Sequence, residues 1–175
     1  MKVSLIAALS TNNVIGRDQG LPWCLRTDLK RFKAMTTGHH YISGRKTYDT
    51  VGKPLPGRTN IVITRQPDFA AEGIIVVHTL EEALRVAREA GETEVFIGGG
   101  GEIFTQALHG ADRMYLTRVH AEVEGDTYFP DFDDVSEWQL VDSEHFEADE
   151  KNDYPFSFLT YERAGAEGHA IPDEG

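Results

Sequence analysis

The sequence has almost no cysteine, no long apolar run and no excess of basic residues. Cys24 is the single cysteine of the 175 residues, so no internal disulfide can form. This usage is typical of a protein in a reducing cytoplasm, which is the location we expect. No apolar stretch approaches the roughly 18 residues of a membrane-spanning helix. The apolar start is interrupted by Asn12 and Asn13, so we expect neither a membrane segment nor an export signal.

The net charge of -12 argues against one large class of partner. Nucleic-acid binding needs basic surface, so nucleic acid is not an expected partner. The charge is also uneven, because eight basic residues and a single acid, Asp49, lie between Leu29 and Pro67, whereas residues 121–163 contain fourteen acids. A local basic region in an acidic protein favours a small anionic ligand. Solvated faces of opposite sign are the alternative.

Short apolar runs alternate with helical patterns, which is typical of an α/β fold. We expect residues 1–163 to form one domain and residues 164–175, which lack periodicity, to form a disordered tail. The last two strands should pair antiparallel, and Thr79 with Glu82 predicts a capping box. Strands are expected at 3–9, 41–44, 60–64, 74–77, 95–97, 114–119, 138–146 and 156–161, and helices at 25–35, from 45, from 79 to about 91, and from the glycine run to 108.

Asp28 lies on the apolar side of the first predicted helix, together with Leu25, Leu29, Phe32 and Met35. A carboxylate there needs a reason, because burying an unpaired charge is costly. One interpretation is a catalytic or ligand-binding acid, whose pKa desolvation should raise above the usual value of about 3.9. The other is an acid in the first helical turn that stabilises unpaired N–H groups and the helix dipole.

Two strand-to-helix junctions carry features of an anion site. The four glycines 98–101 can bring backbone N–H groups close to a pyrophosphate, although Ile103 occupies the third glycine's place in the dinucleotide fingerprint. Residues 43–47 place two cations and a hydroxyl at another helix start, where cations are unfavourable unless an anion joins them. Arg65, at the end of the next strand, can add a bidentate contact. A ligand-free turn and plain surface cations are the alternatives.

Two further features, Arg58 and Trp23, have both a functional and a structural interpretation, and a histidine pair has neither. A Leu-Pro-Gly turn fixes Arg58 before a strand, which suits carboxylate recognition, although a surface salt bridge is the commoner role. Trp23 follows a polar loop and is either the anchor of a lid or a packed side chain. The adjacent His39 and His40 have no partner at ligand spacing, so no metal site is expected.

Taken in order, these segments resemble dihydrofolate reductase of the bacterial chromosomal type. The resemblance implies a mainly parallel eight-stranded sheet with an antiparallel last strand, flanked by four helices. It implies hydride transfer from NADPH to C6 of dihydrofolate with protonation of N5, which gives tetrahydrofolate for one-carbon metabolism. The segments, which cover nearly all of residues 1–162, are SLIAAL with NNVIG, GLPWCLRTDLKRFK, ISGRKTYDTVGKPLPGRTNIVITR, VFIGGGGEIF and MYLTRVHAEVEGDTYFPDF.

The resemblance also implies residue roles. Asp28 would bind the pterin and Thr117 would support it, Trp23 would hold an ordered water, and Leu21 would complete the catalytic group. Arg58 would pair with the α-carboxylate of the substrate, and Gly99-Gly100 would be a cis peptide. The substrate would also contact Ile6, Ala8, Leu29, Phe32, Val51, Lys53, Leu55 and Gly98. NADPH would contact Ala8, Val14, Ile15, Gly16, Leu21, Gly44, Arg45, Lys46, Thr47, Thr64, Arg65, His78, Gly99, Gly100, Gly101, Glu102, Ile103 and Phe104.

Residues 14–21 match the mobile loop that closes over the nicotinamide, and Asp126 matches a residue that steadies this loop. The implied ligands include antifolates such as methotrexate or trimethoprim, and we expect a monomer. Phe104, Gly98 and Ser43 depart from the family pattern. Phe104 lacks the hydroxyl of a frequent tyrosine, Gly98 lacks the packing of a bulkier side chain, and Ser43 takes an often apolar place.

Two rival functions keep the same fold or the same ligands. A related reductase would act on a pyrimidine of the riboflavin pathway and would not need Asp28 together with Arg58. A catalytically silent nucleotide- or folate-binding module is supported only by Phe104. NADPH oxidation that depends on added dihydrofolate separates these functions.

Overall fold

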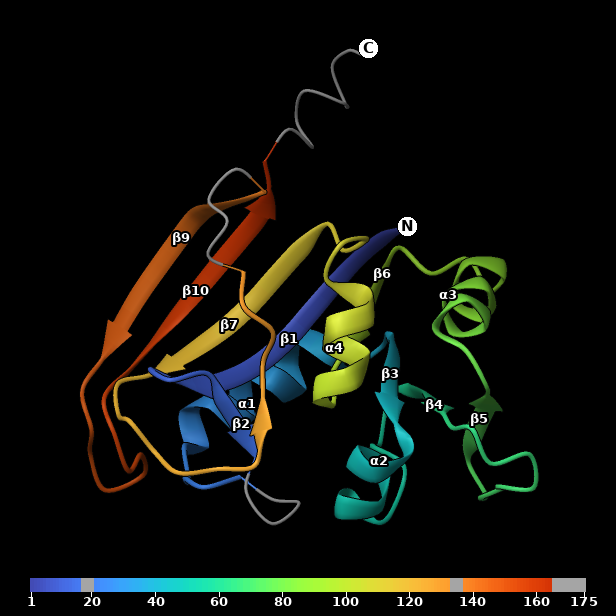
Figure 1. The fold of residues 1–175 in the computed structure, drawn as a ribbon, viewed down its shortest axis with the longest axis horizontal. Coiled ribbons are helices and arrows are strands. Elements are labelled where there is room, and N and C mark those ends of the chain that lie inside the picture. Colours follow the sequence, from blue (N-terminus) through green and yellow to red (C-terminus); the bar gives the residue numbers. More distant parts are fainter. Residues whose placement is uncertain (17–20, 133–136, 165–175) are drawn as a thin grey trace.

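The computed structural model describes residues 1–16, 21–132 and 137–164, which build one large sheet and one small sheet. The large sheet has eight strands in the order β5-β4-β3-β6-β1-β7-β10-β9 (Figure 1). The pairings from β5 to β7 are parallel, whereas β10 is antiparallel to both β7 and β9. The expected sheet with an antiparallel last strand is therefore confirmed. The strands are β1 Lys2–Ser10, β3 His40–Gly44, β4 Thr59–Ile63, β5 Ile74–Val77, β6 Glu94–Ile97, β7 Arg113–Val119, β9 Trp138–Phe146 and β10 Phe156–Arg163.

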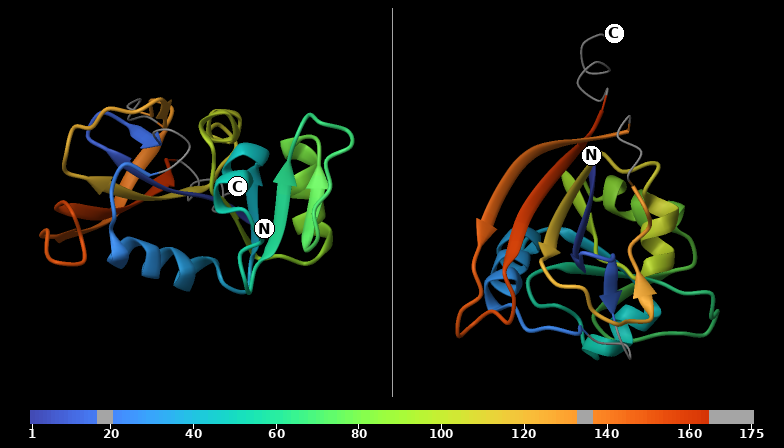
Figure 2. Two further views of the ribbon diagram at one scale, coloured as in Figure 1. Left: turned by 90° about the horizontal axis from the view of Figure 1, so that it is seen from below. Right: turned by 60° about the vertical axis from the view of Figure 1, so that its left-hand side comes forward.

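Four helices of the described residues flank this sheet, as expected, and α1 and α4 lie on opposite faces of it (Figure 2). Each predicted helix or strand boundary agrees with the structure to within two residues. None of the described helices has the length and apolar character needed to cross a bilayer. The predicted tail falls almost wholly on residues 165–175, which lie outside the described residues. The helices are α1 Arg26–Thr36, α2 Arg45–Val51, α3 Leu80–Glu89 and α4 Gly101–Ala107.

The central strands are apolar on both faces because helices cover both sides of the sheet. Leu5 of β1, Ile61 of β4 and Ile97 of β6 are all 0 % exposed. Ala83 of α3 and Phe104 of α4 belong to the same buried cluster. This core fixes the carboxyl ends of β1, β3 and β6, which carry the candidate site.

A small second sheet was not foreseen from the sequence. β2 (Val14–Gly16) pairs antiparallel with β8 (Thr127–Tyr128), and the N–H of Asp126 donates to the Gly16 carbonyl at 3.1 Å. Gly125 permits this approach, because a Cβ there would lie 2.2 Å from Val14 Cγ1. The first part of the expected loop is thus a strand, and Asp126 does lie against it. Residues 17–20 of that loop lie outside the described residues.

The predicted capping box at α3 forms with one difference. The hydroxyl of Thr79 accepts a hydrogen bond from the Glu82 N–H at 3.0 Å. The Glu82 carboxylate accepts from the N–H of His78 at 3.2 Å, one residue earlier than the reciprocal bond of a capping box. His78 is thereby tied to the start of α3.

Candidate active site

Asp28 faces the sheet from the first turn of α1. Its Oδ1 accepts a hydrogen bond from the hydroxyl of Thr117 on β7 at 2.5 Å. Burial raises the pKa of Asp28, while the Thr117 hydrogen bond and the charge of Arg31 act in the opposite direction. The expected upward direction of the pKa is confirmed, and the carboxylate is held by a residue 89 positions away in the sequence.

The hydrogen bonds favour the ligand-binding interpretation of Asp28, because α1 is capped from elsewhere. The N–H of Thr27 donates to Asn152 Oδ1 at 3.1 Å, and Asn152 Nδ2 donates to the hydroxyl of Thr27 at 3.0 Å. Asn152 is 4 % exposed. Within the described chain, Thr117 is the one hydrogen-bond partner of the Asp28 carboxylate. The helix therefore does not use this carboxylate as a cap, which leaves it available to a ligand.

The apolar side of α1 is less buried than its spacing predicts. Leu29 is 52 % exposed, and Thr36 is the only fully buried residue of the helix. Leu21 and Val51, which were also expected to line the ligand site, are 52 % and 47 % exposed. The exposure of Leu29 leaves it accessible to a ligand, which is the role that the family resemblance implies for it.

Trp23 lies beside α1 and packs in a cluster with Leu25, Val119 and Phe156. It is 7 % exposed, and its indole Nε1 is buried without a hydrogen-bond partner among the described residues. A buried donor of this kind is normally satisfied by an ordered water. The indole is thus a packed side chain, as one interpretation expected, and it also carries an N–H with no partner among the described residues.

Arg58 is held in place by neutral groups rather than by a carboxylate. Its Nε donates to the Pro56 carbonyl at 2.9 Å, and one terminal nitrogen donates to the Thr36 hydroxyl at 3.1 Å. Its guanidinium lies 6.0 Å from the centroid of the Phe32 ring. In the described part of the chain it makes no salt bridge, so the surface-salt-bridge alternative is not realised.

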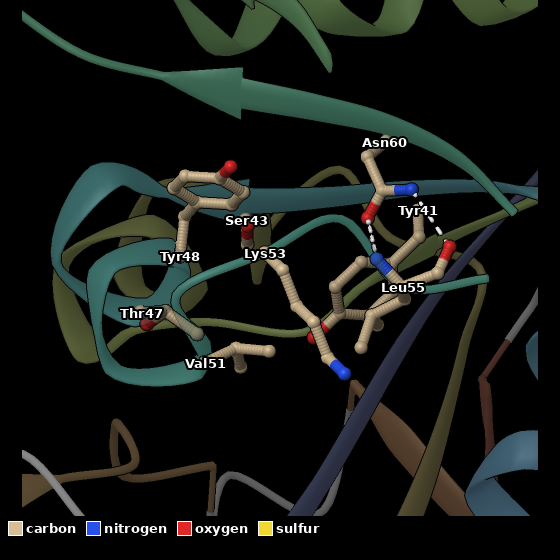
Figure 3. A pocket seen from close by; sticks show the side chains of 8 residues that line it. All are labelled: Tyr41, Ser43, Thr47, Tyr48, Val51, Lys53, Leu55 and Asn60. Atoms are coloured by element: carbon tan, nitrogen blue, oxygen red, sulfur yellow. Dashed lines mark hydrogen bonds between the residues drawn. The ribbon is translucent and has the colours of Figure 1, made fainter. Parts of the chain in front are cut away.

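A cavity opens between α2 and the Leu-Pro-Gly-Arg turn (Figure 3). Asn60, which is 6 % exposed, shapes this turn, because its amide pairs with both backbone groups of Leu55 at 2.9 and 3.0 Å. Asn60 belongs to one of the segments that resemble the family, but nothing in the sequence indicated this role. The lining residues are Tyr41, Ser43, Thr47, Tyr48, Val51, Lys53, Leu55 and Asn60.

The two predicted anion junctions lie side by side. The N–H of Gly44 donates to the Gly99 carbonyl at 2.7 Å, and a Cβ on Gly100 would lie 3.3 Å from Thr47 Oγ1. The Gly99-Gly100 peptide is cis, as expected. Arg45 forms an ion pair with Asp49 at 2.9 Å on the exposed side of α2. Backbone amides and cations therefore share one region at the carboxyl ends of β3 and β6.

The end of β4 adds a third group of polar residues to this region. Arg65 is 84 % exposed at its side chain and forms an ion pair with Glu102 of α4. His78 Nδ1 lies 2.8 Å from the Thr64 carbonyl. An exposed ion pair contributes little free energy, so Arg65 can exchange Glu102 for a stronger anion.

The remaining predicted residues fall into two groups. Ile6 and Ala8 are half-buried on β1, beside Thr117 of β7. Ile103 and Phe104 are buried in α4, and the Phe104 ring lies 4.9 Å from that of Phe129. The described residues contain no cluster of three or more His, Cys, Asp or Glu side chains suited to a metal ion.

The structure also corrects the expectation that packing is lost at Gly98. The phenol of Tyr41 fills the space beside Gly98, where a Cβ would lie 1.8 Å from the Tyr41 hydroxyl oxygen. Tyr41 was missed because a tyrosine in a short strand gives no sequence signal of a binding role. Its partner position, the glycine that directly follows β6, was visible only as a departure from the family pattern.

Comparison with known proteins identifies the family to which this chain is similar. The family model described as Dihydrofolate reductase matches residues 2–163. The dihydrofolate reductase of Bacillus subtilis is 46 % identical over 161 residues, which is 92 % of this chain and 94 % of the relative. Dihydrofolate reductase type 3 of Salmonella typhimurium is 44 % identical, over 93 % and 99 % of the two chains. A solved structure of Enterococcus faecalis dihydrofolate reductase, complexed with NADP(H) and RAB-propyl, aligns with a TM-score of 0.87 at 40 % identity, over 93 % and 96 % of the chains.

Proposed function

This chain belongs to the dihydrofolate reductase family, and we propose that Asp28 is the carboxylate with which it engages the pterin ring. It is an NADPH-dependent oxidoreductase that reduces dihydrofolate to tetrahydrofolate, a carrier of one-carbon units. The observation that supports the role of Asp28 is its placement. The carboxylate is half-buried, accepts from Thr117, and lies on a helix whose N-terminus Asn152 already caps.

Asp28 acts on the proton without contacting the atom that receives it. An ionised carboxylate accepts hydrogen bonds from the 2-amino group and N3 side of the pterin. By binding this side of the ring it favours the form protonated at N5. Water then delivers the proton, and the unpaired Trp23 Nε1 supports the proposal that Trp23 orients such a water.

The residues at the neighbouring junctions fit NADPH, which supplies the hydride for C6 of the substrate when bound. Because Gly44 and the glycines from Gly99 carry no side chain, a pyrophosphate can approach the backbone closely there. Lys46 and Arg65 bring positive charge that suits the 2′-phosphate. Thr47, Thr64 and His78 lie in the same region and complete the proposed contacts.

Arg58 is proposed to bind the α-carboxylate of the substrate's glutamate. Its guanidinium is oriented by Pro56 and Thr36, and no described carboxylate neutralises it. A planar fork with a free edge matches a carboxylate bidentately. Phe32 lies beside the Arg58 guanidinium, and Leu55 packs in the same apolar cluster as Phe32. We propose that the part of the substrate between Asp28 and Arg58 packs against these apolar side chains.

The proposal also covers the inhibitors, the cellular location and the oligomeric state of the protein. Methotrexate and trimethoprim should compete with dihydrofolate, because both present a ring that Asp28 can engage. A cytoplasmic location is supported by the single cysteine, Cys24. We include a monomeric state in the proposal, and sedimentation over a range of concentrations tests it.

The decisive experiment follows NADPH consumption with and without dihydrofolate. Consumption should depend on dihydrofolate, and methotrexate should inhibit it competitively. A pyrimidine of the riboflavin pathway should give no turnover, which separates the related reductase. NADPH binding without any dihydrofolate-dependent oxidation would instead identify a silent binding module.

A further inference from the structure

Tyr41 and Gly98 form one packing unit across two neighbouring strands. β3 and β6 are paired at Ile42 and Ile97, and the Gly98 N–H donates to the Ile42 carbonyl at 2.9 Å. A Cβ built on Gly98 would lie 1.8 Å from the Tyr41 hydroxyl oxygen and 2.3 Å from Cζ. Two atoms that are not covalently bonded do not approach each other this closely. The tip of Tyr41 therefore occupies the place where any side chain at position 98 would begin.

The surroundings of Tyr41 are those of the proposed substrate site. Its ring meets that of Phe32 edge to face at 5.5 Å, and Ile6 and Leu55 pack against the same cluster. Tyr41 also lines the cavity beside Leu55 (Figure 3). These neighbours are residues proposed to contact dihydrofolate, and the charge of Arg58 also acts on Tyr41.

The hydroxyl of Tyr41 has no hydrogen-bond acceptor among the described residues. Tyr41 is 7 % exposed as a whole, but its hydroxyl oxygen is not one of the fully buried unpaired atoms of the described residues, so the tip of a side chain that lines the cavity stays accessible. Burial raises its pKa to about 12, although the nearby charge of Arg58 acts to lower it. The group is thus protonated at neutral pH. An unsatisfied donor at the wall of a cavity is poised for a ligand.

We propose that Tyr41 is a specificity-determining residue whose hydroxyl donates to the aminobenzoyl segment of dihydrofolate, and that Gly98 is required to make room for it. This inference rests on the proposed function. The aminobenzoyl segment joins the pterin to the glutamate, so it spans the interval between Asp28 and Arg58. Its carbonyl oxygen is the acceptor available there.

Tyr41→Phe tests the hydroxyl alone, because the ring and its packing remain. The dissociation constants of dihydrofolate and methotrexate should rise about threefold to tenfold, as for the loss of one neutral hydrogen bond. The constants of NADPH and of dihydrobiopterin, which carries the pterin without the aminobenzoyl segment, should stay within about twofold. An unchanged dihydrofolate constant overturns the proposal, and so does an equal rise for all four ligands.

A second set of variants tests the coupling to position 98. Gly98→Ala should weaken dihydrofolate binding because its Cβ displaces Tyr41, and Tyr41→Val combined with Gly98→Ala should remove the clash and regain stability. Gly110→Ala is the matched control, since a Cβ there meets nothing within 4 Å. Additive effects on stability in the double variant would overturn the pairing. If the wild type itself lacks dihydrofolate-dependent NADPH oxidation, the proposed function fails; if it turns over while Tyr41→Phe binds like the wild type, only this inference fails.

Discussion

The hydroxyl of Thr117 donates to Asp28 Oδ1 at 2.5 Å, which joins the middle of the sheet to the first turn of α1. This bond orients the carboxylate that we propose engages the pterin. It also opposes the effect of burial on the Asp28 pKa. The pair therefore influences both the orientation and the charge of the carboxylate that we propose binds the pterin.

Asp28→Asn should preserve the fold and lose most of the turnover at neutral pH. The amide keeps the shape but cannot bind the pterin as an anion, so kcat with dihydrofolate should fall about 100-fold or more. Stopped-flow turnover and circular dichroism check the two halves of the prediction. Asp68→Asn, at an exposed turn, is the control. Near-normal turnover in Asp28→Asn would refute the assignment.

Arg31→Gln should raise the pKa of Asp28 further. The charge of Arg31 acts to lower that pKa, so its removal leaves burial opposed by Thr117 alone. Carbon-13 titration of the aspartate carboxyl in the ligand-free protein measures the change directly. Arg26→Gln, on the exposed side of the same helix, should leave the titration where it is. A downward movement in Arg31→Gln would contradict the electrostatic account.

Arg65→Ala should reduce the preference for NADPH over NADH. The loss of one exposed charge-assisted contact predicts a rise of about tenfold in the KM for NADPH, with little change for NADH. Glu102→Gln should act in the opposite direction, because it releases Arg65 from its ion pair. Steady-state kinetics with both cofactors tests the two variants together. Equal effects of Arg65→Ala on NADPH and NADH would exclude a role in binding the 2′-phosphate.

The pKa of Glu92 predicts how the stability of the folded protein changes in acid. Burial favours its neutral form, but hydrogen bonds with His40, His39 and the Glu94 N–H outweigh this and lower its pKa to about 2. Because the folded-state pKa is below the model value of 4.5, the unfolded chain binds more protons, and stability is lost as pH falls from about 4.5 to about 2.

Glu92→Gln provides the corresponding test of acid stability. The charged form contributes at most about 3 kcal/mol to the free energy of unfolding at neutral pH. Urea unfolding at several pH values should therefore show a flatter acid limb in Glu92→Gln than in the wild type. Glu89→Gln, at the exposed end of α3, serves as the control. An unaltered acid limb in Glu92→Gln would assign the pH dependence to other groups.

The sequence predicts the elements of the large sheet because its strands are continuous apolar runs and its helices carry recognisable starts. It also predicts the cis peptide and the Asp28–Thr117 pair through the family resemblance. It does not predict that Asn152 caps α1 or that β2 pairs with β8, since both contacts join residues more than 100 positions apart. Leu29 shows the same limit, because spacing identifies an apolar side chain but not whether an open site lies beside it.

The position of β1 in the sheet has a consequence for how the protein is made. β1 is the first strand synthesised, yet its two neighbours are β6 and β7, so Lys2 pairs with Glu94 and Ser4 with Arg113. Closing such long loops costs entropy before pairing compensates for it, which slows folding. A nascent chain that ends before Glu94 leaves β1 without either neighbour. Ile6 and Ala8 therefore reach their places in the proposed substrate site only after most of the chain has left the ribosome.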